Sequence, residues 1–134
     1  MSIEQLAITV TADTESVTTV RHFVRAATRE LGTMVDPQVA ELLASELAAN
    51  AVEVAAGEIT VTAQCARGRL RVEVRDFGYG RPQASRPDPL DLGGGRGLMI
   101  VDQLADQWGV DEFLPGKIVW FELTDDADRR VSPS

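Results

Sequence analysis

Hydrophobic and polar residues alternate near the start of the chain and then follow a helical spacing. Residues 6–10 alternate between apolar and small or polar side chains, which predicts a strand with one buried face. From residue 17 to residue 31, apolar residues recur at helical steps, which predicts a helix. Asp13 or Thr14 is its expected N-cap, and Gly32 is its expected left-handed end.

A second helical pattern begins at Asp36-Pro37 and runs to Gly57. Proline is well placed at a first helical position because its missing N–H would have no partner there. Residues 59–66 and 70–75 then alternate cleanly on either side of Arg67-Gly68, which predicts a hairpin of two strands.

Residues 76–97 contain six glycines and three prolines and show no sustained period. A long irregular segment inside a small domain is usually functional, so we interpret it as a lid over a site. A third helix is predicted from Leu98 to Trp108, with Gly109 at its end. Two final strands are expected around residues 110–113 and 118–123.

The order of these elements predicts the fold class. Strand, helix, helix, hairpin, lid, helix and hairpin imply an α+β protein, a two-layer α/β sandwich with helices on one face of a mixed, mostly antiparallel sheet. A chain of 134 residues has room for one such domain, expected over residues 1–124. Residues 125–134 are polar and aperiodic, so we expect a disordered tail there.

Composition narrows the possible partners. The formal net charge is -8, and nucleic-acid binding depends largely on phosphate contacts from Lys and Arg, so we expect a protein partner and no direct nucleic-acid binding. The sequence shows neither a charged leader followed by an apolar stretch nor an apolar run long enough to cross a bilayer. We therefore expect a cytoplasmic protein without a membrane partner.

Four arginines lie on one face of the predicted hairpin, interrupted by one glutamate: Arg67, Arg69, Arg71, Glu73 and Arg75. Two interpretations remain open. The residues form either an ordinary solvated sheet face or a docking patch for a negatively charged partner.

Glu46 and Asn50 are four residues apart in the second predicted helix, so both project from one face toward the same ligand. An Asn amide oxygen is a hard, neutral ligand that suits Mg²⁺ bound to a triphosphate. A Glu one turn away is placed to orient or deprotonate an attacking hydroxyl. Taken alone, Glu46 also fits a solvated surface charge, and Asn50 fits a helix cap or a residue without a particular role.

Asp76-x-Gly78-x-Gly80 follows the second strand of the hairpin. Its simplest interpretation is a turn. The functional interpretation is that Asp76 accepts a hydrogen bond from the exocyclic amine of adenine, while the two glycines let the backbone approach the base. Guanine presents a carbonyl at that position, so such a site favours adenine.

A glycine-rich segment leads directly into the third predicted helix, where Gly95-Arg96-Gly97-Leu98 marks the junction. Free N–H groups and the helix dipole make a helix N-terminus an anion site, and Arg96 adds a positive charge. The alternative is a flexible glycine hinge. The order of the three motifs along the chain favours a single nucleotide site.

At these residues the sequence resembles the GHKL or Bergerat-fold ATPases. Their N-box corresponds to Glu46…Asn50, and their two glycine boxes to Asp76-x-Gly78-x-Gly80 and Gly95-x-Gly97. Within that group the sequence most resembles the anti-sigma-factor serine/threonine kinases of bacterial partner-switching systems.

The resemblance implies ATP and Mg²⁺ as cofactors, with Glu46 as catalytic base, Asn50 as Mg²⁺ ligand and Asp76 as adenine reader. Residues 81–97 would cover the phosphates. It also implies a homodimer whose partners are a sigma factor and an anti-sigma-factor antagonist phosphorylated on serine or threonine.

Two other functions remain open. The first is a non-catalytic nucleotide-binding module that switches protein partners. It is favoured by Glu53, which places a negative charge near the predicted metal site, and by Ile118, which follows Gly116-Lys117 where the similar kinases usually carry Thr. The second is a detached sensor-kinase domain that phosphorylates histidine on another chain.

Overall fold

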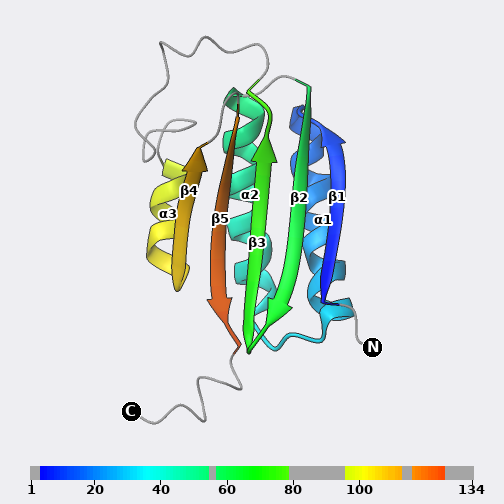
Figure 1. The fold of residues 1–134 in the computed structure, drawn as a ribbon, viewed down its shortest axis with the longest axis vertical. Helices are drawn as coiled ribbons and strands as arrows, with labels where there is room; N and C mark the ends of the chain where they lie inside the picture. The colour runs from blue at the N-terminus through cyan, green and yellow to red at the C-terminus, as the bar shows by residue number, and fades with distance from the viewer. Residues whose placement is uncertain (1–3, 55–56, 79–95, 113–115, 126–134) are drawn as a thin grey trace.

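The computed structural model describes residues 4–54, 57–78, 96–112 and 116–125 (Figure 1). Within these ranges the chain forms five strands and three helices. The elements are β1 (Gln5–Thr11), α1 (Thr14–Leu31), α2 (Pro37–Val54), β2 (Glu58–Ala66), β3 (Arg69–Asp76), α3 (Arg96–Leu104), β4 (Gln107–Glu112) and β5 (Lys117–Thr124).

The strands form one sheet in the order β1-β2-β3-β5-β4, and the helices lie behind it in Figure 1. The predicted α+β two-layer fold is confirmed. Every pairing between the described strands is antiparallel, so within them the sheet is wholly antiparallel and not mixed as predicted. The last strand in sequence, β5, is inserted between β3 and β4, which brings its first residue beside the last residue of β3.

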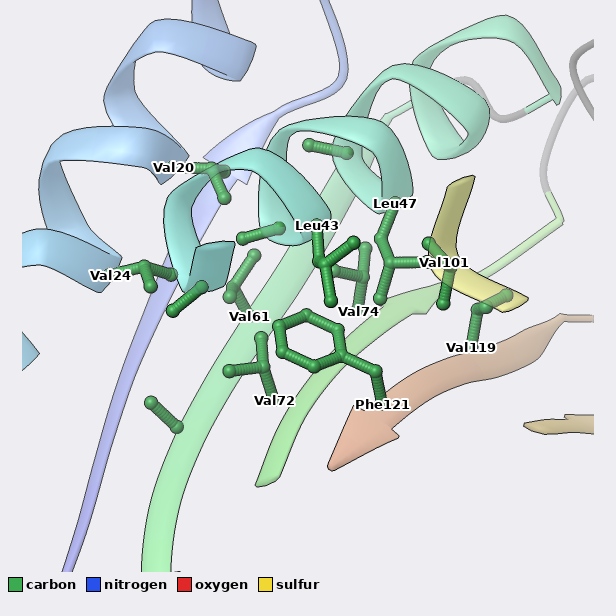
Figure 2. Close-up of a cluster of buried hydrophobic side chains, with 14 of the residues drawn as sticks. Val20, Val24, Leu43, Leu47, Val61, Val72, Val74, Val101, Val119 and Phe121 are labelled. Atoms are coloured by element: carbon green, nitrogen blue, oxygen red, sulfur yellow. The ribbon is translucent and has the colours of Figure 1, made fainter. Parts of the chain in front are cut away.

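One hydrophobic core lies between the sheet and the helices. Every second residue of the strands faces α1 and α2. Figure 2 shows the Phe121 ring of β5 among the buried side chains of this core. The core side chains labelled there are Val20, Val24, Leu43, Leu47, Val61, Val72, Val74, Val101, Val119 and Phe121. This packing fixes the position of α2 over β3 and β5.

Local sequence signals account for both ends of α1 and for the turn between β2 and β3. The Asp13 carboxylate accepts a hydrogen bond from the Ser16 N–H at 3.0 Å, and Gly32 has φ +69° at the C-terminus of α1. These predicted caps are confirmed. Arg67 and Gly68 both have positive φ, as a two-residue turn between β2 and β3 requires.

The prediction that the third helix reaches Trp108 and ends at Gly109 is wrong, because both residues lie in β4. The Ala105 N–H still bonds to the Val101 carbonyl, but the Asp106 N–H bonds to Glu122 of β5. Pairing with β5 therefore replaces the helical hydrogen bonds from this point. A Cβ on Gly109 would lie 2.8 Å from the Trp120 ring, so this glycine makes room for an indole and does not end a helix.

The predicted tail lies outside the described residues from 126 onward. Its first residue, Asp125, is buried, and its carboxylate accepts a hydrogen bond from the Met34 N–H at 2.6 Å. Its own N–H bonds to the Gly68 carbonyl, which ties the end of β5 to the β2–β3 turn. No helix in the described part of the chain is both long and apolar enough to cross a membrane.

An ion pair joins the two long helices. Arg25 of α1 donates two hydrogen bonds to the Glu41 carboxylate of α2, at 3.0 and 2.8 Å. Glu41 is buried, and the bond from Arg25 holds the pKa of its carboxyl below the ordinary value. The folded state therefore favours the ionised form of Glu41.

We expect Glu41→Gln to lower the free energy of unfolding at neutral pH. Because the folded-state pKa is lowered, the contribution of the carboxylate is complete above its ordinary pKa and is lost as pH falls through the folded value. The difference in stability between wild type and variant should stay constant down to about pH 5 and shrink below about pH 4.5. Urea unfolding across this range measures it, with the exposed Glu30→Gln as control. A difference that persists at pH 3 would contradict the assignment.

Candidate functional site

The elements that carry the predicted site residues meet at one end of the sheet. In Figure 1 the C-terminus of α2, the end of β3, the start of β5 and the start of α3 all lie at the upper end of the molecule. This arrangement follows from the antiparallel strand order, because β5 begins where β3 ends.

Helix α2 places a buried amide at this end. Asn50 is 5% exposed, and its Nδ2 is buried without a hydrogen-bond partner among the described residues. Glu46 lies one turn earlier and is partly exposed. A buried polar group without a partner is rare in folded proteins, and an Asn inside a helix has no structural advantage. Asn50 is therefore a candidate for contact with a ligand, and rotation of its amide would present either the nitrogen or the oxygen.

Asp76 is the last residue of β3, and its side chain points to the helix side of the sheet. It is 3% exposed. Its Oδ1 accepts a hydrogen bond from the Gly78 N–H at 3.0 Å, and Gly78 has φ +72°, a conformation that suits glycine. The turn predicted at this motif is therefore present, and it fixes the carboxylate at the edge of the core.

The structure places Lys117 at the candidate site, a position that the sequence alone did not reveal. It is the residue paired with Asp76 across β3 and β5, and its Nζ lies 2.6 Å from Oδ2 of Asp76. Both side chains are almost completely buried. Ile118, which the sequence analysis singled out, is the next residue of β5, so its side chain points to the opposite, outer face of the sheet. The residue of this strand that faces Asp76 is therefore Lys117.

The glycine-rich junction is only partly described. Arg96 and Gly97 form the first residues of α3, and Leu98 is completely buried against the core. The helix begins two residues before the predicted Leu98. Gly80 and Gly95, together with most of the predicted lid, lie outside the described residues, so their part in a phosphate site stays a prediction.

The arginines of β3 lie in a network of charges on the outer face of the sheet. Arg71 donates to Glu73 at 2.7 Å and to Glu122 at 3.0 Å, and its guanidinium lies 4.0 Å from the Trp120 ring centroid. Arg69 contacts Glu122 at 3.4 Å. These ion pairs favour the interpretation of this region as a solvated sheet face.

The polar side chains at this end of the sheet fit a nucleotide with a metal ion. A buried carboxylate supplies an acceptor for a base amine, and the Asn50 side chain, whose Nδ2 has no partner among the described residues, also carries a neutral oxygen of the kind that suits Mg²⁺. Mg²⁺ is commonly held by one or two protein groups together with substrate phosphates, so a single ligand from α2 suffices. Glu46 adds a carboxylate that is partly exposed to solvent.

Known proteins share the sequence pattern and the fold of this chain. Residues 10–123 match the family model of the histidine kinase-like ATPase domain. The fold is similar to the crystal structure of the RsbU and RsbW domains of Rv1364c from Mycobacterium tuberculosis, with a TM-score of 0.66 and 22% identity. That match covers 92% of this chain and 33% of that one, so this chain spans about a third of its length.

A second similar structure is the Acinetobacter baumannii histidine kinase AdeS, with a TM-score of 0.54 and 13% identity. The match covers 94% of this chain and 70% of that one. No curated protein sequence matches the chain. At these identities the two structures establish the fold only.

Proposed function

Because the chain belongs to the histidine kinase-like ATPase domain family, we propose that it binds ATP with Mg²⁺ and acts as an anti-sigma-factor serine/threonine kinase. In this proposal it holds a sigma factor inactive and phosphorylates an antagonist protein, as part of a bacterial partner switch. The observation that carries the ATP site is the pair of buried polar side chains, Asp76 and Asn50, at one end of the sheet.

Each residue has a defined role in the proposed reaction. Asp76 accepts the amine of adenine, and Asn50 holds Mg²⁺, which neutralises charge on the phosphates when bound. Glu46 orients or deprotonates the attacking serine or threonine hydroxyl. The start of α3, with Arg96 and Gly97, offers N–H groups to phosphate. The similarity to a structure that contains an RsbW domain supports the partner-switching context.

We expect Asn50→Ala to weaken Mg²⁺-dependent ATP binding at least about tenfold, because it removes the proposed metal ligand. Calorimetric titration with ATP, with and without Mg²⁺, measures the change. Glu53→Gln alters an exposed group one turn further along α2 and serves as the control, because removing its negative charge should leave ATP binding unchanged or slightly stronger. Equal binding by wild type and Asn50→Ala in Mg²⁺ would exclude Asn50 as the ligand.

The phosphorylated residue is identified by the chemistry of its bond. The purified chain is incubated with γ-labelled ATP and an extract of the source cells, and the labelled proteins are treated with acid. Phosphoserine and phosphothreonine survive this treatment, whereas phosphohistidine does not. Acid-stable label that appears only when the chain is added to the extract supports the serine/threonine kinase, and acid-labile label that depends on the chain would instead support the sensor-kinase alternative.

A non-catalytic, nucleotide-dependent switch is the second candidate function. Glu53 favours it, because this exposed carboxylate lies one turn beyond Asn50 and repels a bound triphosphate. In such a module ATP or ADP changes only which partner is held. ATP binding by the chain, with no label in the extract beyond that seen without the chain, would favour this function.

A further inference from the structure

The ion pair of Asp76 and Lys117 places a hydrogen-bond acceptor and a donor side by side at the end of the sheet. The two residues are direct neighbours across β3 and β5, and Nζ lies 2.6 Å from Oδ2. Their side chains are 4% and 8% exposed. A charge pair this deeply buried is costly to form, and hydrophobic residues would serve stability equally well. Its position beside the proposed nucleotide site therefore calls for a functional explanation.

The Asp76 carboxylate is held in place by two hydrogen bonds but can accept more. Gly78 donates to Oδ1 at 3.0 Å and Lys117 donates to Oδ2, so two donors orient the group. An ionised carboxylate has about four acceptor positions on its two oxygens. Asp76 can therefore accept a base amine while it keeps both of these contacts.

The ammonium group of Lys117 has more N–H donors than its contact with Asp76 uses. Nζ of Lys117 carries three N–H groups, and within the described ranges Asp76 is its one hydrogen-bond partner. Buried donors are nearly always bonded in folded proteins. An acceptor on a ligand next to the amine held by Asp76 would satisfy one of the remaining donors.

Gly116 explains why the two side chains lie so close. A Cβ at this position would overlap the carbonyl oxygen of Asp76 and come within 2.8 Å of the Phe77 Cα. Only glycine lets β5 start this close to the end of β3. The first side chain of β5 is then that of Lys117, and it lies directly against the carboxylate.

We propose that Lys117 is a base-recognition residue that donates to ring atom N1 of adenine while Asp76 accepts from the neighbouring N6 amine. This inference rests on the proposed ATP site. Adenine presents a donor at position 6 and an acceptor at position 1, which matches Asp76 and Lys117 in that order. Guanine presents an acceptor and a donor in the reverse order, so both contacts become repulsive. The pair therefore rejects guanine more strongly than Asp76 alone.

Nucleotide analogues test the proposal on the unaltered protein. In 1-deaza-ATP the N1 acceptor is replaced by C–H, whereas 7-deaza-ATP keeps the whole edge that faces the pair and is the matched control. We expect 1-deaza-ATP to bind about 10- to 100-fold more weakly than 7-deaza-ATP, the range for losing a hydrogen bond to a charged group. Equal binding of the two analogues would overturn the proposal.

The variant Lys117→Met distinguishes a direct contact from a contact through water. If Lys117 donates to N1, the variant binds ATP more weakly but shows no further loss with 1-deaza-ATP, because both changes remove the same interaction. Its preference for ATP over GTP should also fall. A penalty for 1-deaza-ATP that is as large in the variant as in wild type would assign N1 to another donor and overturn the proposal.

Lys117→Met leaves a buried carboxylate without its cation, so a second measurement avoids dependence on its folding. The analogue 1-methyl-ATP carries a methyl group and a positive charge at N1. Beside an ammonium it should bind more than about 100-fold more weakly than ATP, since like charges repel strongly at a buried site. Binding close to that of ATP would overturn the direct contact.

The two levels of the proposal fail in different ways. If wild type binds no ATP, the ATP site itself is wrong and the role of Lys117 falls with it. If ATP binds and the two deaza analogues bind equally, only the role of Lys117 is wrong.

Discussion

Leu43→Ala is expected to lower the free energy of unfolding by about 2–5 kcal/mol, the range for removing a buried leucine side chain. Leu43 is 0% exposed, and Figure 2 shows it between α2 and the strands, near Val74 and the Phe121 ring. Collapse into the space left behind is opposed by the buried side chains of the sheet that surround Leu43. A domain of ordinary stability, about 5–15 kcal/mol, would lose a large share of it.

The neighbouring residue provides a matched control for this prediction. Leu42 has the same side chain in the same helix but is 41% exposed. Leu42→Ala changes helix propensity equally and should cost about 1 kcal/mol or less. Urea unfolding of both variants measures the difference. Equal losses would mean that α2 does not pack on the sheet through Leu43.

Elements with strong local signals were predictable from the sequence. Helix α1 has a capping aspartate, a regular apolar spacing and a terminal glycine, and each signal acts over only a few residues. The β2–β3 hairpin is likewise specified by its alternation and its two-residue turn. In these segments local conformation and tertiary packing favour the same structure, so no long-range information was needed.

The boundary between α3 and β4 could not be predicted in the same way. Leu104 and Trp108 keep a helical spacing, so the apolar pattern continues after the helix has ended. The helix ends because β5 offers hydrogen bonds to Asp106, and because the Trp120 ring fits only against a glycine at 109. Both causes come from a strand that follows later in the sequence. A single-sequence pattern carries no information on that pairing.

The same limit applies to the candidate site. Glu46, Asn50 and Asp76 were predicted from motifs whose spacing is local. Lys117 was not predicted because its position beside Asp76 depends on the register between β3 and β5, which are separated by the predicted lid and by α3 and β4. The sequence did hold one signal: a charged residue, Lys117, directly after a glycine and at the start of β5. The other residues of β5 at alternate positions from Lys117 are buried and apolar. Only the strand order shows that this charge faces Asp76.

The positions of these residues separate binding from catalysis in a way that mutations can test. Asp76 and Asn50 are buried, so they are suited to hold parts of a ligand that stay in place. Glu46 lies on the same face of α2 but is partly exposed. A residue that acts on a protein substrate bound in addition to ATP must be accessible in this way. In the proposed function a change at Glu46 should therefore affect the reaction and not the affinity for ATP.

Glu46→Gln is expected to lower the rate of phosphotransfer by about 10²–10⁴-fold, the usual contribution of a general base. Glutamine has nearly the same size and keeps the hydrogen-bonding reach, but it cannot take the proton of the serine or threonine hydroxyl. ATP affinity should stay within about twofold of wild type, since the side chain acts on the attacking group. Transfer of label from γ-labelled ATP measures the rate, and calorimetry measures the affinity.

Glu53→Gln is the matched control, because it makes the same chemical change two turns further along α2 at an exposed position. Its transfer rate should equal that of wild type or rise slightly, since a charge that repels the triphosphate is removed. If Glu46→Gln transfers label at the wild-type rate, Glu46 is not the base. If both variants lose ATP affinity together, the effect lies in the helix and not in the chemistry. Loss of transfer in Glu46→Gln alone, with affinity retained, would distinguish a kinase from a module in which the nucleotide serves only as a switch.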